Sequence, residues 1–320
     1  MKIVEKTLIR QVHDRSAPGA LNLGLGEPGF PTPAPIIAHV RGHLQEWSLG
    51  YTPNEGLGEL RQKIAETESA AARFSVPPER VVVTVGSEEA LFMILLAAVE
   101  PGDEVLVPDP GYPAYPSIVR LAVGRPISYP LSAADRFRLR STAILERINS
   151  RTRAIVLNSP NNPTGSIYTD GELEALAEGL RGSDILVVSD ECYRSLSYGA
   201  APASIQARYE DTCVVNSLSK SHSMTGWRLG WAIVPPRWLK SLAACHQLGV
   251  TCASAVSQKA AVFALGGGAE AACAANREEL RRRGSLALAG LDRYAGWKAA
   301  APEGGFYIFV DAAEDCARIG

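Results

Sequence analysis

One lysine in this sequence has neighbours suited to covalent chemistry. Lys220 follows an apolar run at 213–215, lies among serines, and precedes Arg228 by eight positions. A free lysine has a pKa of about 10.4 and is a poor nucleophile at neutral pH. Burial and cationic neighbours lower that pKa, so that the neutral amine can form an imine with an aldehyde. The stretch 217–230 therefore indicates a reactive lysine next to residues that can bind an anion.

The elements that must position this lysine can be predicted from apolar runs. Buried strands are expected at 81–85, 104–107, 153–157, 184–188 and 213–215. Helices are expected after Pro35 and at 57–73, 86–99 and 170–180. Near-continuous apolar strands that alternate with helices favour an α/β fold with a mostly parallel sheet covered by helices on both faces. Ligands of such sheets bind at the carboxyl ends of the strands.

Chemically useful side chains follow these strand ends, namely Tyr112, Asn162, Asp190, Tyr193 and Lys220. Pyridoxal phosphate offers a group for each of them. Its aldehyde suits the lysine, and its ring nitrogen stays protonated beside a carboxylate such as Asp190. Tyr193 and Asn162 can hydrogen-bond the phenolic oxygen, and Tyr112 can stack on the ring. The set therefore predicts a pyridoxal phosphate site.

The phosphate of that cofactor has its own candidate partners. Gly86 and Ser87 lie at a strand-to-helix turn, where free backbone N–H groups attract phosphate. Ser217 and Arg228 can add a hydroxyl and a guanidinium. Glu88 is included in the cofactor-binding segment, although its carboxylate and that of the next glutamate should point away from an anion. An ordinary helix cap would also explain Ser87.

Four motifs in this order strengthen the prediction. D-P-G-Y-P, N-S-P-N-N-P-T-G, S-D-E-x-Y and S-L-S-K-x-x-x-M-T-G-W-R-L-G resemble the fold-type I pyridoxal phosphate aminotransferases of the aspartate aminotransferase-like class I/II group. The resemblance runs from about residue 23 to 310. It implies that Lys220 forms the internal aldimine and shuttles a proton, with Asp190 and Tyr193 as its catalytic companions. The implied reaction moves an amino group from an amino acid to a 2-oxo acid by a ping-pong mechanism.

The resemblance also implies an assembly and a substrate site. Tyr51 would reach across a homodimer interface to the phosphate of the partner subunit. Gly26 and Asn162 would lie close to the substrate, and Arg194 is a further candidate substrate contact. A large cofactor-binding domain is expected at 46–268.

The ends of the chain are predicted to form a smaller, incomplete α/β domain. Residues 1–45 would supply an N-terminal arm and part of that domain, and 269–320 its truncated start. Family members usually continue further and carry an arginine that binds the substrate carboxylate. Three explanations stay open: the chain is truncated, its substrate lacks a free carboxylate, or Arg194, Arg10 or Arg15 binds the substrate instead.

Two other functions stay open beside the aminotransferase. The same fold and motifs serve lyases, decarboxylases and specialised amino-acid-modifying enzymes. A cofactor-binding remnant without turnover is the second alternative.

Composition excludes several classes. A net charge of −2 over 320 residues gives no basic surface for nucleic acid. The longest apolar run, 90–99, is too short to span a membrane, and residues 1–6 lack the apolar core of a signal peptide. Six cysteines without a C-x-x-C pair favour reduced thiols, so we expect a cytoplasmic protein. His39 and His43 are four residues apart but have no third ligand nearby, so no metal is expected.

Residues 24–29 formally match G-x-G-x-x-G. A dinucleotide site would need a strand before this motif and a helix after it, whereas prolines surround it here. The glycines are expected to allow a close approach of the backbone.

Overall fold

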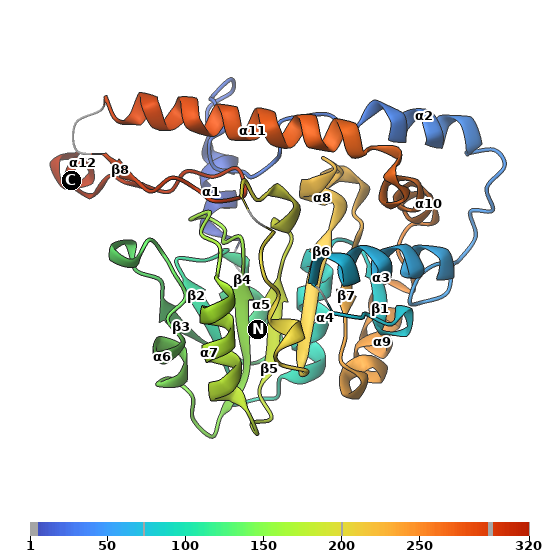
Figure 1. Cartoon of the computed structure of the whole chain (residues 1–320), viewed down its shortest axis with the longest axis horizontal. Coiled ribbons are helices and arrows are strands. Elements are labelled where there is room, and N and C mark those ends of the chain that lie inside the picture. Colours follow the sequence, from blue (N-terminus) through green and yellow to red (C-terminus); the bar gives the residue numbers. More distant parts are fainter. Residues whose placement is uncertain (1–5, 73, 200, 294–296, 320) are drawn as a thin grey trace.

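A computed structural model of the chain describes residues 6–72, 74–199, 201–293 and 297–319 (Figure 1). The first five residues, on which the prediction of no signal peptide depends, lie outside the described residues. The chain forms a seven-stranded sheet with helices on both faces, and a separate two-stranded sheet near its C-terminal end. This confirms the predicted α/β class.

The large sheet has the order β1-β7-β6-β5-β4-β2-β3. Strands β2 to β6 run parallel to one another, and β7 is antiparallel to both β6 and β1. The sheet is therefore mostly parallel, as expected. Its strands are β1 (Val81–Thr84), β2 (Glu104–Asp109), β3 (Arg125–Pro130), β4 (Thr152–Asn158), β5 (Leu186–Asp190), β6 (Thr212–Ser217) and β7 (Gly230–Ile233).

Twelve α-helices are present in the described parts of the chain. They are α1 (Leu8–Arg15), α2 (Ala34–His43), α3 (Gly58–Ala72), α4 (Ser87–Ala98), α5 (Ala114–Leu121), α6 (Ser141–Leu145), α7 (Asp170–Leu180), α8 (Leu218–Ser221), α9 (Pro236–Val250), α10 (Ala255–Phe263), α11 (Glu270–Leu291) and α12 (Ala313–Ile319). Across all described segments, none of these helices is both long and apolar enough to cross a membrane.

Local sequence explains several helix starts. Prolines occupy the first turns of α2 and α9, where the missing N–H costs nothing. Helix α7 begins with a capping box, in which Thr169 and Glu172 satisfy each other's backbone N–H groups.

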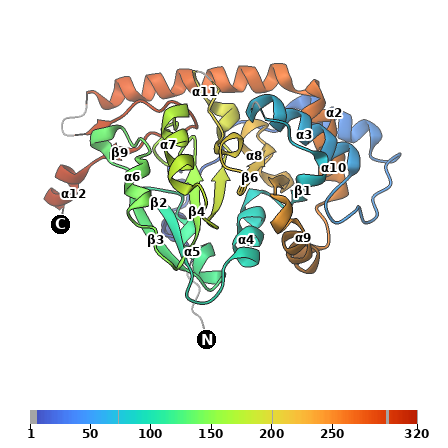
Figure 2. The ribbon, with the colours of Figure 1, turned by 60° about the horizontal axis from the view of Figure 1, so that its bottom comes forward.

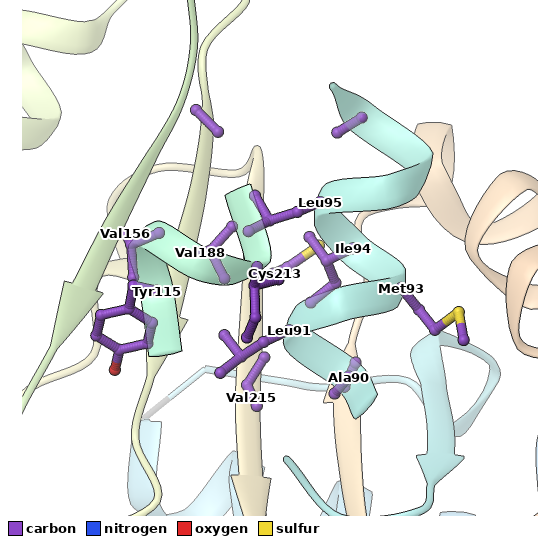
Figure 3. Close-up of a cluster of buried hydrophobic side chains, with 14 of the residues drawn as sticks. Ala90, Leu91, Met93, Ile94, Leu95, Tyr115, Val156, Val188, Cys213 and Val215 are labelled. Carbon is purple, nitrogen blue, oxygen red and sulfur yellow. The ribbon is translucent and has the colours of Figure 1, made fainter. Parts of the chain in front are cut away.

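Alternate residues of the strands enter different apolar layers. Val105 and Val107 pack with α4 and α5, whereas Leu106 packs on the opposite side with α6 and α7. A third cluster joins α3 and α10 to β1 and β7. Figure 3 shows the first layer, where apolar side chains of α4 face Val156, Val188 and Val215 of the sheet. The sheet is therefore rigidly held from both faces.

The strand register aligns the ends that matter for chemistry. Asn158 at the end of β4 pairs with Asp190 at the end of β5. Asp190 in turn pairs with Val215 of β6, and Ser217 pairs with Gly230 of β7. The carboxyl ends of three neighbouring strands therefore meet at one edge, as the parallel arrangement requires.

Several elements were not predicted from the sequence. Helix α1 forms before the helix at residue 34. Strands β3 and β7 complete the sheet: β3 contains two prolines and is partly exposed, so it lacks a continuous apolar run, whereas β7 is short and fully buried.

Beyond the sheet, α11 runs along one side of the molecule (Figures 1 and 2). It extends from the α2 and α10 end to the small sheet of β8 (Lys298–Ala299) and β9 (Val310–Asp311). The segment between β8 and β9 returns towards the large sheet, where Tyr198 N–H donates to Glu303 O. This return brings the C-terminal part of the chain to the strand ends.

Candidate active site

A cavity of about 630 Å³ opens at the carboxyl ends of the strands. Its wall contains nine of the predicted site residues: Gly26, Ser87, Glu88, Tyr112, Asn162, Asp190, Tyr193, Lys220 and Arg228. A larger hollow of about 1200 Å³ lies between α1 and α5, and shares only Tyr112 with that set. The smaller cavity is therefore the candidate active site.

Lys220 lies on the short helix α8 directly after β6. Its Nζ donates a hydrogen bond to the carbonyl oxygen of Gly26 at 2.8 Å. Burial lowers the pKa of Lys220 below its ordinary value, and the nearby Arg228 guanidinium lowers it further. Acidic neighbours oppose the shift without reversing it. The amine is therefore held in the cavity, and at a given pH a larger fraction of it is neutral than for a free lysine.

Gly26 allows this approach because it has no side chain. An ideal Cβ there would lie 1.5 Å from the hydroxyl of Tyr307. Tyr307 thus fills the space over Gly26 and forms part of the cavity wall. The expectation that these glycines permit a close backbone approach is borne out at this position, where residues 24–29 form neither strand nor helix.

Asp190 ends β5 and is buried. One carboxylate oxygen accepts a hydrogen bond from the Tyr115 hydroxyl at 2.7 Å, and the other accepts the Cys192 backbone N–H at 3.2 Å. Burial raises the pKa of Asp190, and these hydrogen bonds partly oppose that rise. Both donors are neutral, so they orient the carboxylate without pairing its charge, although Lys220 in the same cavity also lowers the pKa of Asp190.

Tyr193 and Asn162 lie on the same wall. Asn162 Nδ2 donates to the Tyr193 hydroxyl at 3.4 Å, and that hydroxyl donates to Tyr307 at 3.5 Å. The Asn162 backbone N–H is held by the Asn158 side chain at 2.7 Å. Burial raises the pKa of Tyr193 well above its ordinary range, so its hydroxyl keeps its proton. The pair offers neutral hydrogen-bond donors to a ligand oxygen.

The β1–α4 turn forms an anion cradle. Gly86 has φ of +82°, and an ideal Cβ there would lie 2.5 Å from Nη2 of Arg228. No side chain caps the first turn of α4, so its N–H groups face outward. Ser217 lies beside this turn, because Gly230, its partner in β7, packs against the backbone of Gly86 and Ser87. These groups fit a phosphate.

The two glutamates that open α4 differ. Glu89 turns away from the cavity and binds the Val85 N–H and the His246 ring, the latter at 2.7 Å. Glu88 instead lines the cavity, and accepts a hydrogen bond from the Tyr112 hydroxyl at 3.5 Å. Glu88 therefore orients Tyr112.

Arg194 was predicted as a substrate contact, and this prediction is wrong. The side chain is 7% exposed and does not line the cavity. Its guanidinium is held by the carboxylates of Glu68 and Glu191. Among the other arginines proposed for the substrate, Arg10 lines the cavity and Arg15 does not.

Tyr51 lies outside the cavity of its own chain and is 91% exposed. Its predicted contact with the phosphate of a partner subunit stays a prediction.

Tyr115, Cys192 and Tyr307 are among the cavity residues that were not predicted. Tyr115 follows Tyr112 by three residues inside the G-Y-P-A-Y-P stretch; it lies in the first turn of α5, whereas Tyr112 lies just before that helix. Tyr307 lies in the segment between β8 and β9, within the range 269–320 that was expected to start the small domain. Only the fold brings it back to the strand ends.

A partly buried lysine, a buried acid and a phosphate cradle at the carboxyl edge of this sheet define a pyridoxal phosphate enzyme of fold type I. The chain belongs to the aminotransferase class I and II family, whose model matches residues 18–317. Members of this family use pyridoxal phosphate, so the chain is a pyridoxal phosphate-dependent aminotransferase, as the sequence predicted. The uncapped start of α4 and the glycine beside Arg228 fit the phosphate of that cofactor.

The chain aligns with named relatives over most of its length. It is 36% identical over 306 residues to a probable aspartate/prephenate aminotransferase of Aquifex aeolicus, covering 94% of this chain and 78% of the relative. It is 35% identical to an aspartate aminotransferase of Bacillus subtilis, covering 94% and 77%. The structure of Thermus thermophilus aspartate aminotransferase with maleate matches with a TM-score of 0.88 at 37% identity, covering 91% and 77%.

Proposed function

We propose that Lys220 attaches the cofactor and moves the proton at the α-carbon of the amino acid. The observation that supports this is its partly buried amine, hydrogen-bonded to Gly26 O inside the candidate cavity. When bound, pyridoxal phosphate withdraws electrons from that carbon. Asp190 keeps the ring nitrogen protonated, and Tyr193 and Asn162 donate to the ring oxygen. The neutral Lys220 amine is then able to accept the proton.

The remaining assigned residues hold the cofactor in place. The α4 N-terminus with Gly86 and Ser87, the Ser217 hydroxyl and Arg228 bind the phosphate. Tyr112, oriented by Glu88, stacks on the ring.

The proposed substrates are an amino acid and a 2-oxo acid that carry a second carboxylate. Arg10 and Lys6 line the cavity on the side of α1, where Lys6 is paired with Asp14 at 2.7 Å. Relatives are named for aspartate and prephenate, and one related structure contains maleate, a dicarboxylate. Arg10 would pair with the substrate carboxylate. Half-reactions with aspartate, alanine and an amine test this, since only aspartate should convert the cofactor rapidly. Serine carries a β leaving group, so the release of ammonia and pyruvate from serine would instead indicate a lyase.

A homodimer in the cytoplasm completes the proposal. Tyr51 and Leu248 are 91% and 82% exposed. The loop that carries Tyr51 is joined to the C-terminal end of α9, which carries Leu248, because Asn54 Nδ2 donates to Thr251 O at 2.7 Å. A second copy of the chain would cover this surface and receive Tyr51 in its active site.

Replacement of Lys220 tests the central assignment. The Lys220→Ala chain should form no bond to the cofactor that borohydride can trap, and should lose activity. Trapped cofactor on the folded variant would refute the assignment.

Mixing two variants tests the shared site. Lys220→Ala and Tyr51→Ala chains should each be impaired when pure. Mixed dimers should regain activity, because one of their two sites then has Lys220 from one chain and Tyr51 from the other. If dimers that are shown to contain one chain of each variant do not regain activity, the proposed role of Tyr51 is contradicted.

A further inference from the structure

Tyr115 links the hydrophobic core to the candidate active site. It is 1% exposed and lies on α5, packed with Leu91 of α4 and Val156 of β4 (Figure 3). In that view its hydroxyl oxygen points out of the apolar cluster. The hydroxyl donates to Asp190 at 2.7 Å. The ring is therefore fixed by core packing, while its polar end reaches a carboxylate of the site.

The carboxylate of Asp190 depends on this contact for its orientation. The opposite oxygen accepts a hydrogen bond from the Cys192 N–H at 3.2 Å. Two donors on different oxygens define the plane of the carboxylate. A hydroxyl–carboxylate hydrogen bond is charge-assisted and stronger than a neutral one. Removing it would leave a buried oxygen without its donor.

Tyr115 also contacts the residue expected to stack on the cofactor. The rings of Tyr112 and Tyr115 are 5.4 Å apart between centroids and are inclined at 86°. This edge-to-face geometry is favourable for aromatic pairs. One side chain thus supports both the acid and the stacking ring.

We propose that Tyr115 is a positioning residue that fixes the Asp190 carboxylate and the Tyr112 ring for the cofactor. The proposal rests on the proposed role of Asp190 at the ring nitrogen. Tyr115 would act through these two side chains.

The test compares two tyrosine-to-phenylalanine variants in the full chain. Tyr115→Phe removes the hydroxyl and keeps the ring in the core. Tyr129→Phe is the matched control, because Tyr129 is also 1% exposed and its hydroxyl donates to Val156 O at 2.8 Å, away from the cavity. Pyridoxal phosphate affinity is measured by titrating each chain and following absorbance. We expect about tenfold weaker binding for Tyr115→Phe, and a change below about twofold for the control.

A double-mutant cycle with Asp190→Ala separates positioning from general packing. In that background the Tyr115 hydroxyl has lost its acceptor, so Tyr115→Phe should weaken binding no further. Equal weakening by the two phenylalanine variants, or an undiminished effect in the Asp190→Ala background, would overturn the proposal.

The same titrations distinguish failure of this inference from failure of the proposed function. Unchanged affinity in Asp190→Ala would refute the role of Asp190 itself. Weakened affinity in Asp190→Ala with wild-type affinity in Tyr115→Phe would overturn only the positioning role.

Discussion

Two consecutive carboxylates at the end of β5 lie in different environments. Asp190 lines the cavity, and its partners are the Tyr115 hydroxyl and a backbone N–H. Glu191 does not line the cavity. It binds the Arg194 guanidinium and accepts hydroxyl hydrogen bonds from Ser189 at 3.0 Å and Ser204 at 2.7 Å. Side chains of consecutive residues in an extended chain point to opposite faces, so the sheet separates the two acids.

The difference shows how charge is distributed around this sheet. The Glu191 charge is paired within the chain by an arginine that also binds Glu68. Asp190 has neutral donors, which orient its carboxylate and leave its charge available for a cationic ligand. Glu191, which is paired with an arginine, therefore has a structural role, whereas Asp190, which forms no ion pair with an arginine, faces the ligand.

The largest expected effect comes from the acid at the cavity. Asp190→Asn keeps the shape and removes the charge, so the ring nitrogen loses its anionic partner. We expect kcat/KM to fall about 10³-fold, the scale of losing one preorganised electrostatic contact. The matched control is Glu191→Gln, which should keep most of the activity of each folded molecule. A comparable fall in kcat/KM in both variants would abolish the distinction between the two acids.

The next effect concerns stability. Arg194→Met leaves Glu68 and Glu191 buried without their cation, and should lower the free energy of unfolding by about 3–5 kcal/mol. Urea unfolding measures this loss. Arg281→Met, which breaks an exposed pair with Glu278, should change stability little. If Arg194→Met also prevented substrate turnover by folded, cofactor-loaded protein, Arg194 would have more than a structural role.

A variant of Asn216 tests whether the buried ion pairs of Glu68 and Glu191 are coupled to the cofactor cavity. Its Nδ2 donates to Glu68 at 3.0 Å, and its Oδ1 accepts the N–H of Ser217 at 2.8 Å. Asn216→Ala should cost about 1–3 kcal/mol of stability, because buried groups lose their partners. Cofactor affinity should fall a few-fold as Ser217 shifts. Unchanged affinity in a destabilised variant would show that the network and the phosphate site are independent.

The smallest expected effect is a shift in the pH dependence of covalent cofactor attachment. Burial depresses the pKa of Lys220 below its ordinary 10.5, and the neutral amine is the attacking form. The rate of covalent cofactor attachment should therefore rise with pH and level off below pH 10.5. Stopped-flow absorbance measures this profile. The cofactor-free fold should also gain stability between the depressed pKa and 10.5, where the unfolded chain binds more protons. A plateau only above pH 10.5 would contradict the shift.

Much of this arrangement could be predicted from sequence, because it depends on local patterns. The apolar runs of β4, β5 and β6 are continuous, and their functional residues follow within a few positions. The location of Lys220, Asp190 and Asn162 in one cavity follows from parallel strands alone.

The remainder depends on long-range packing. Arg194 is close in sequence to Asp190, but its pairing with Glu68 of α3 joins residues 126 positions apart. No local pattern therefore predicts that the charge of the Arg194 guanidinium is neutralised by carboxylates of the same chain. Tyr307 was missed for the same reason, since only the return of the chain between β8 and β9 brings it to Gly26.

The contact between Lys220 and Gly26 spans 194 positions, and Tyr307 closes over it from near the other end of the chain. Contacts of such sequence separation form late, because the intervening loop must close first. On the ribosome, β5 with Asp190 and β6 with the following Lys220 emerge well before residue 307. A nascent chain can thus assemble its sheet while the pocket is still open to water. Secure capture of the cofactor is therefore expected only after residue 307 has emerged.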